Sequence, residues 1–149
     1  MQIRSPNPND KASWLSLWAG YLDFYGASVS DTVTDLTWDR FFDVGEPVYL
    51  LVAADEAETL IGFVTYVLRR STWSAGHYCY LEDLFVDPKG RGGGVARRLI
   101  NAVADHAREG RCDRLYWNTQ SGNDRAKGLY DQLADLTDFV QYRMPLGAD

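Results

Sequence analysis

The chain has 149 residues, of which 46% are hydrophobic and 13% aromatic, which is enough to bury one core and excludes a disordered chain. Its formal net charge of −6 argues against nucleic-acid binding and mildly favours cationic partners. No apolar run is long enough to span a membrane, and residues 1–6 carry no signal-peptide core. We therefore expect one domain over residues 1–149, with no membrane association.

The first half of the chain predicts a strand, two helices and a hairpin. The predicted elements, in order, are a short strand at 3–6, a helix that Asp10 caps, a polar loop at 26–35, a short helix at 37–43, and strands at 48–55 and 60–69. The apolar face of the first helix carries Trp14, Leu17, Trp18, Tyr21 and Tyr25. A loop at 71–76 then presents Trp73.

A strand at 80–86 is apolar on both faces, as is typical of the middle of a sheet. Asp87-Pro88 ends it, because proline cannot donate to a ladder. A turn follows that contains Gly90, Gly92, Gly93 and Gly94. From Val95 the apolar spacing is helical as far as Gly110, which is placed to end the helix.

The remaining elements are a strand at 114–119, a helix at 124–133 and a last strand at 139–144. This order of strands and helices predicts a mixed central sheet with helices on both faces, which is an α/β domain.

The glycine turn also predicts an anion site, because a helix that begins there directs its unpaired N–H groups and its positive dipole end at one point. The P-loop is excluded because Val95-Ala96 follows Gly94 where Lys-Ser/Thr is required. The dinucleotide fingerprint is excluded as well, because the turn falls past the middle of the chain.

Glu82 and Asp83 interrupt the apolar strand, and regular alternation would point them to opposite faces of the sheet. Burying a carboxylate without a partner costs several kcal/mol or raises its pKa, and a raised pKa suits a general base. Two structural alternatives stay open. Arg69 or Arg70 would satisfy Glu82, and Asp83 would cap backbone groups near an expected bulge.

The cysteines indicate a reduced setting. Cys79 and Cys112 have neither metal-ligand nor redox spacing, and with only two histidines we expect no metal site. We therefore expect a cytoplasmic protein.

The chain resembles the GNAT superfamily of N-acetyltransferases over nearly its whole length. The resemblance rests on Leu81-Glu82-Asp83-Leu84-Phe85-Val86, on Arg91-x-x-Gly94-x-Ala96, and on Asn123-x-x-Ala126-x-x-x-Tyr130. The Leu-Glu-Asp run is similar to that of diamine (spermidine/spermine) acetyltransferases. Phe24-Tyr25-Gly26, Ser71-Thr72-Trp73 and Phe139-Val140-Gln141-Tyr142 resemble the HPA-type branch. Ala96 and Asp138 depart from the glycines that are common there.

The resemblance implies a mixed, mostly antiparallel sheet in which a splayed strand pair holds acetyl-CoA. The residues implied to bind acetyl-CoA are Leu84, Phe85, Val86, Arg91, Gly92, Gly93, Gly94, Val95, Ala96, Arg97, Asn123 and Lys127. For Arg97 and Lys127 the alternative is an ordinary solvated charge on a helix.

The resemblance also implies roles in catalysis and in binding the acceptor. Glu82 would accept a proton from the amine, and Tyr130 would protonate the thiolate that leaves. Asp83, Trp73 and Tyr25 are candidates for contact with the acceptor. Tyr130 lies on the apolar face of its helix, so a core tyrosine is the alternative.

The predicted activity is direct transfer of acetyl from acetyl-CoA to a primary amine of a small, polyamine-like cation, in a ternary complex of a homodimeric enzyme. One alternative is acetylation of protein lysines or N-termini. Another is a catalytically inactive acyl-CoA-binding regulatory module.

Overall fold

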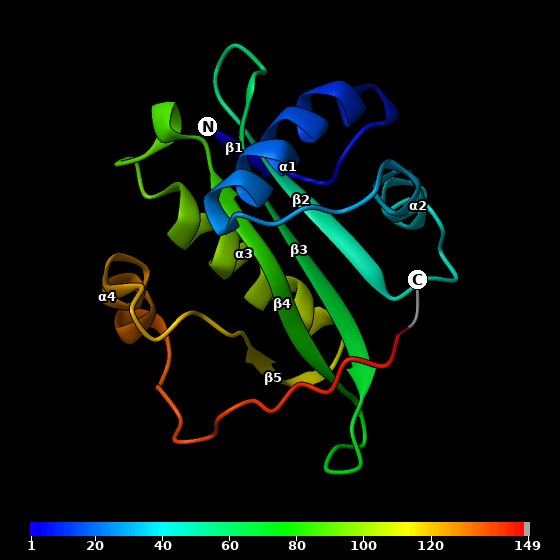
Figure 1. Cartoon of the computed structure of the whole chain (residues 1–149), viewed down its shortest axis with the longest axis vertical. Coiled ribbons are helices and arrows are strands. Elements are labelled where there is room, and N and C mark those ends of the chain that lie inside the picture. Colours follow the sequence, from blue (N-terminus) through cyan, green and yellow to red (C-terminus); the bar gives the residue numbers. More distant parts are fainter. Residues whose placement is uncertain (148–149) are drawn as a thin grey trace. The chain divides into compact units, whose positions relative to one another are not determined.

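A computed structural model describes residues 1–147 (Figure 1). The chain divides into two compact units, Met1–Asn118 and the part from Thr119 onward. The helices and strands of the first unit are β1 (Gln2–Arg4), α1 (Lys11–Tyr25), α2 (Asp31–Arg40), β2 (Val48–Ala54), β3 (Leu60–Arg70), β4 (His77–Val86), α3 (Val95–Glu109) and β5 (Cys112–Tyr116). The second unit contains α4 (Asp124–Leu133).

The strands of the first unit form one sheet in the order β1-β2-β3-β4-β5. The first three pairings are antiparallel and the last, between β4 and β5, is parallel. Short turns can join antiparallel neighbours, whereas the parallel pair needs a crossover, which α3 provides. The predicted mixed and mostly antiparallel sheet is confirmed.

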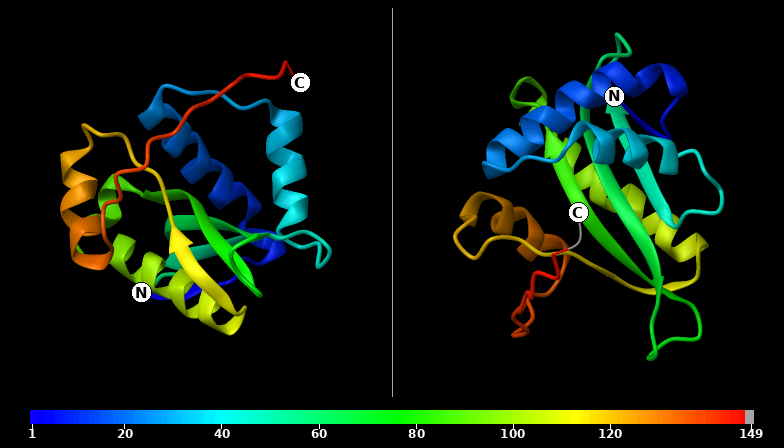
Figure 2. Two further views of the ribbon diagram at one scale, coloured as in Figure 1. Left: turned by 90° about the horizontal axis from the view of Figure 1, so that it is seen from below. Right: turned by 45° about the vertical axis from the view of Figure 1, so that its right-hand side comes forward.

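Helices cover both faces of this sheet, as predicted (Figure 2). On one face α1 and α2 bury Trp14 and Trp38 against Val52, Phe63 and Phe85. On the other, α3 presents an apolar stripe whose buried members are Val95, Leu99, Ile100, Val103 and Ala107. No helix within residues 1–147 is long and apolar enough to cross a membrane.

The second helix lies earlier in the chain than the predicted 37–43, because Ser30 starts it by accepting a hydrogen bond from the N–H of Val33. The loop predicted at 26–35 therefore ends at Ser30. Asp10 precedes α1 but does not cap it. Its carboxylate instead pairs with Arg4 at 2.7 Å and accepts from the N–H of Asn7, so the ion pair competes successfully for the oxygens that a cap would use.

The predicted last strand at 139–144 is wrong for this structure, since the segment joins no ladder. An alternating apolar pattern forms a strand only where a neighbouring strand has an unpaired edge. Residues 139–144 pair with none of the described strands. Its large side chains stay exposed, with Phe139 at 87% and Tyr142 at 95%.

Candidate active site

The ladder between β4 and β5 ends where Tyr80 pairs with Tyr116, although β4 continues to Val86. From Leu81 onward, this edge of β4 therefore pairs with no strand of the described residues. The parallel pairing thus covers only the first part of β4, because β5 ends at Tyr116. Such an edge can pair with an extended ligand as it would with another strand.

Backbone alternation decides which groups face the open edge. The N–H of Asp87 donates to the carbonyl of Ile61 on β3, so the backbone of Phe85, two residues earlier, also faces β3. Leu84 and Val86 consequently face outward, and the Val86 carbonyl accepts from Arg91 Nε at 3.1 Å. Phe85 contributes a core side chain instead, since it is only 9% exposed.

Glu82 occupies a bulge in β4. Asp83 pairs with Thr65 and Leu81 pairs with Tyr66, which leaves Glu82 as an extra residue without a partner on β3. The bulge expected near Asp83 is therefore present, and it interrupts the regular alternation of Glu82 and Asp83 at this point. Burial is the main cause that raises the pKa of the Tyr21 hydroxyl, and the charges of Asp83 and, to a smaller extent, Glu82 raise it further. A bulge of this kind redirects side chains, and here the charges of both carboxylates act on one phenol.

Both carboxyls are shifted in the direction that favours the protonated form. Desolvation by burial, followed by the charge of Asp83, raises the pKa of Glu82, although its side chain keeps access to solvent. Burial also raises the pKa of Asp83, while hydrogen bonds from Thr65 and Tyr21 oppose that rise. Glu82 is thus a solvent-accessible carboxylate with increased basicity, which are the properties of a general base.

The close approach of α1 to β4 positions the tyrosines. A Cβ at Gly20 would lie 2.9 Å from the tip of the Phe85 ring, so a larger residue there would have to displace that ring. Tyr21 follows it, and its ring packs 5.1 Å from that of Tyr25. The charge of Asp83 raises the pKa of both hydroxyls, after the larger effect of burial. Tyr25, a candidate for contact with the acceptor, therefore lies within the electrostatic influence of Asp83.

The glycine turn connects β4 to α3. Gly92 and Gly94 adopt left-handed backbones, with φ of 90° and 73°. A Cβ at Gly92, Gly93 or Gly94 would meet no atom within 4 Å, so the space beside the bare backbone is open. Gly94 precedes α3 without a side-chain cap, and the first amides of a helix have no partner within it. The turn has the features of an anion site.

The two arginines that were alternative partners for Glu82 bind other groups. Arg69 donates to the Tyr116 hydroxyl at 2.7 Å, and Arg70 donates to the carbonyls of Ala75 and Gly76. The alternative in which one of these arginines satisfies Glu82 is therefore not supported. Trp73 lies in the loop between β3 and β4, 85% exposed. That loop precedes His77, which is roughly 16 Å along β4 from Glu82 at the usual rise per residue.

The second unit holds the other candidates. Asn123 caps α4 by accepting from the N–H of Ala126, and Lys127 Nζ donates to the carbonyl of Ser121 at 3.3 Å. Tyr130 lies one turn before the end of α4 and is half-buried. The predicted bounds of this helix, 124 to 133, are confirmed.

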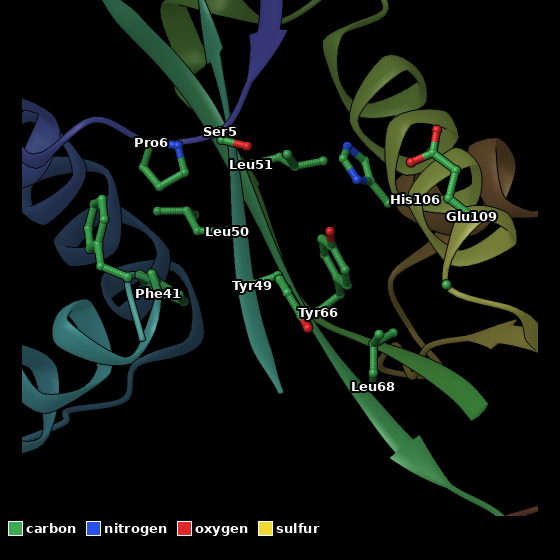
Figure 3. A pocket seen from close by; sticks show the side chains of 12 residues that line it. Ser5, Pro6, Phe41, Tyr49, Leu50, Leu51, Tyr66, Leu68, His106 and Glu109 are labelled. Carbon is green, nitrogen blue, oxygen red and sulfur yellow. The ribbon is translucent and has the colours of Figure 1, made fainter. Parts of the chain in front are cut away.

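A separate pocket of about 530 Å³ lies between the C-terminal end of α3, strands β2 and β3, and the residues after α2 (Figure 3). Tyr49, Tyr66, His106 and Glu109 are among its lining residues. None of the sequence-predicted site residues lines it, so the predicted chemistry is not located there.

Two contributors to the carboxylate cluster were not predicted as site residues. Tyr21 was assigned only to the apolar face of its helix. Thr65 was not predicted as a site residue, although a hydroxyl among the apolar residues of a buried strand indicates a polar contact inside the fold. Its partner, Asp83, is 18 residues away, and the register that joins them includes a bulge that periodicity does not reveal.

Comparisons with known proteins agree with this geometry. The model of the Acetyltransferase (GNAT) family matches residues 14–134. The chain is 32% identical to the D-amino-acid N-acetyltransferase HPA3 of Saccharomyces cerevisiae, across 95% of this chain and 88% of that protein. It is 37% identical to the thialysine N-epsilon-acetyltransferase of Bos taurus, across 53% of this chain and 47% of that protein.

A solved structure of a probable acetyltransferase shares the fold, with a TM-score of 0.85, full coverage of both chains and 22% identity. The family model spans most of the chain and includes the open strand edge, the bulge and the glycine turn. The chain therefore belongs to the GNAT family and is an acetyl-CoA-dependent N-acetyltransferase.

Proposed function

We propose that this enzyme transfers acetyl directly to a primary amine on a small cationic acceptor, within a complex that holds both substrates. The observation that carries the proposal is Glu82, a carboxylate of raised pKa in a bulge beside an open strand edge. A second carboxylate, Asp83, stands next to it and favours a cation. Two relatives named for acetylating amino compounds support an amine acceptor.

The residues of the first unit fit acetyl-CoA. The outward backbone groups of Leu84 and Val86 would pair with amides of the pantetheine arm. The amides of the glycine turn and of the first turn of α3 would bind the pyrophosphate. Arg91 and Arg97 flank that turn and would add positive charge. In the second unit we assign Asn123 to the pantetheine and Lys127 to a phosphate, in line with the family resemblance.

Acetyl-CoA supplies the acetyl group as a thioester. The acceptor amine arrives as an ammonium ion and must lose a proton before its nitrogen can attack the acetyl carbon. Glu82 would accept that proton. As the new C–N bond forms and the C–S bond breaks, the Tyr130 hydroxyl would donate a proton to the sulfur. No residue need carry the acetyl group, so direct transfer is the simplest sequence.

Substituting Glu82 with glutamine tests the assignment, because the change preserves size while removing the proton acceptor. We expect kcat/KM to fall by roughly a hundredfold near neutral pH, the usual contribution of a positioned base. Activity should recover as pH rises and the free amine becomes available without help. Glu56→Gln, at an exposed turn residue, is the matched control. A Glu82→Gln enzyme that keeps the wild-type pH–rate profile would remove the general-base role.

A panel of amines, assayed by release of the CoA thiol, distinguishes the acceptor classes. Turnover with small diamines or amino acids supports the proposal, whereas turnover only with peptides would identify a protein acetyltransferase. Acetyl-CoA binding without turnover on any acceptor would indicate a regulatory module.

We also propose a cytoplasmic homodimer. Cys79 and Cys112 are both free thiols, which suits a reducing compartment. Several large apolar side chains near the C-terminus are more than 70% exposed, and a second copy of the chain would cover them; they include Leu136, Val140, Tyr142 and Leu146. Truncation after residue 134 should then convert a dimer into a monomer in light scattering, and an unchanged mass would exclude this interface.

A further inference from the structure

Asp83 is held by hydroxyl groups from two different elements. Thr65 Oγ1 on β3 donates to Asp83 Oδ2 at 2.5 Å, and the Asp83 N–H donates back to the same oxygen at 3.1 Å. From α1, a hydrogen bond from the Tyr21 hydroxyl lowers the pKa of the Asp83 carboxyl, against the larger effect of burial. The carboxylate is therefore held from β3 and from α1 at once, while its own backbone is tied to Thr65.

Burying the Asp83 carboxylate in this way would be energetically unfavourable if its role were only structural. Thr65 is 3% exposed and is one of the few polar side chains buried in the described part of the chain. The groups that shift the pKa of Asp83 are its burial and the two hydroxyls, with no cation among them. A buried carboxylate without a counter-ion is unfavourable, and an apolar pair of similar size is usually at least as stable. The network is better explained by a ligand that brings the missing positive charge.

We propose that Thr65 and Tyr21 are positioning residues, which hold the Asp83 carboxylate as a fixed anion that seats the acceptor's ammonium group beside Glu82. This inference rests on the proposed function. A carboxylate has about four acceptor positions, so two hydroxyl donors leave room for an ammonium ion. The rings of Tyr21 and Tyr25 add aromatic surface beside the carboxylate, which suits a cation. The ligand class is therefore a primary ammonium on a short chain.

The titratable groups around Asp83 define how the proposed ammonium-binding site responds to pH. They are Glu82 and Tyr80 on β4, and Tyr21 and Tyr25 on α1. Burial raises the pKa of all three tyrosines, so their hydroxyls stay neutral near pH 7. Hydrogen bonds from Thr65 and Tyr21 lower the pKa of Asp83 against the larger effect of burial. Burial and then the charge of Asp83 raise the pKa of Glu82. Loss of either hydroxyl should therefore act on both carboxyls.

Two substitutions test the proposal. Thr65→Val and Tyr21→Phe each remove one hydroxyl and little else. We expect each to raise KM for the amine about tenfold or more, the usual effect of losing a hydrogen bond to a charged group, while KM for acetyl-CoA stays unchanged. The acidic limb of the kcat/KM profile should shift to higher pH, because binding of the ammonium group needs an ionised Asp83 and each variant makes Asp83 more readily protonated. Thr65→Ser should restore both values.

Matched controls separate positioning from simple stability. Thr34→Val removes the hydroxyl of another buried threonine, and Tyr66→Phe that of a buried tyrosine outside the cluster; neither should change KM for the amine. If Thr65→Val and Tyr21→Phe only melt earlier and keep the wild-type KM and profile, the inference is wrong.

A second readout does not depend on catalysis. Carboxyl ¹³C NMR titration should show a higher pKa for Asp83 in Thr65→Val than in the wild type, and an unchanged pKa would overturn the positioning role. An enzyme inactive on every amine, with this NMR shift present, would instead refute the proposed function while leaving the hydroxyl contacts supported.

Discussion

Replacing Gly93 with leucine tests whether the glycine turn binds an anion. A Cβ at this position meets no atom within 4 Å, and the Gly93 backbone lies outside the left-handed region that Gly92 and Gly94 adopt. The new side chain therefore enters open space without backbone strain. We expect stability to change by no more than about 0.5 kcal/mol, as for an ordinary surface substitution.

The loss of acetyl-CoA affinity should be far larger. The leucine side chain would occupy the space that the pyrophosphate needs in order to reach the amides of Val95 and Ala96 on the first turn of α3. Hydrogen bonds to a charged group contribute roughly 1.5–3 kcal/mol each. Losing two of them corresponds to about 3–6 kcal/mol, or roughly 10² to 10⁴ in dissociation constant.

Titration calorimetry with acetyl-CoA, beside thermal melts, measures both quantities. Gly94→Ala and Gly26→Ala serve as comparisons, because both glycines have positive φ, 73° and 60°, and open space at the Cβ. Each should lose about 1–2 kcal/mol of stability from backbone strain, and Gly26→Ala should retain full affinity. Wild-type affinity in Gly93→Leu, or weakening that merely follows a lower melting temperature, would refute the assignment of the turn to the cofactor.

Three further outcomes are expected. Tyr130→Phe should lower kcat with little change in acetyl-CoA affinity, and higher pH should not rescue it; a wild-type pH–rate profile with earlier melting would make Tyr130 a core residue. Asp10→Asn should destabilise the fold by about 1 kcal/mol at pH 7. The hydrogen bond from Arg4 lowers the pKa of Asp10, so this difference should vanish in denaturant melts as pH falls through that lowered pKa. For Asp83→Asn we expect the opposite dependence on pH. Burial raises the pKa of Asp83 in the folded state, so the stability of the wild type declines as pH rises from about 4 and this carboxyl loses its proton. The stability of the variant should decline less steeply with pH, and its activity should be lost. An unaltered slope of stability against pH in the same denaturant melts would contradict the raised pKa of Asp83.

Local sequence signals predicted much of the fold. The helix at 124–133 is recovered with its bounds, because an asparagine cap and an apolar stripe lie within ten residues of each other. The hairpin of β2 and β3, the glycine turn and α3 were recognisable for the same reason. The second helix was placed too late, although Ser30 carried a usable capping signal. Its outer apolar residues, such as Val33 and Leu36, are exposed and give a weak stripe.

Other features depend on partners that are distant in sequence. Asp10 has the residue type of a helix cap, but Arg4 takes its carboxylate. The segment at 139–144 has a strand-like pattern, and alternation cannot reveal whether a strand edge is there to pair with it.

The sequence by itself determined that a strand carrying adjacent carboxylates leads through a glycine turn into a helix, since these signals are contiguous and the conformations of glycine and proline are local properties. Tertiary structure decided what those carboxylates can do. One unpaired residue in β4 breaks the alternation at Glu82, Thr65 reaches Asp83 across the sheet, and Gly20 lets Tyr21 approach from α1. Burial, register and helix approach arise only when segments far apart in the chain pack together, and they set the pKa values on which the proposed chemistry depends.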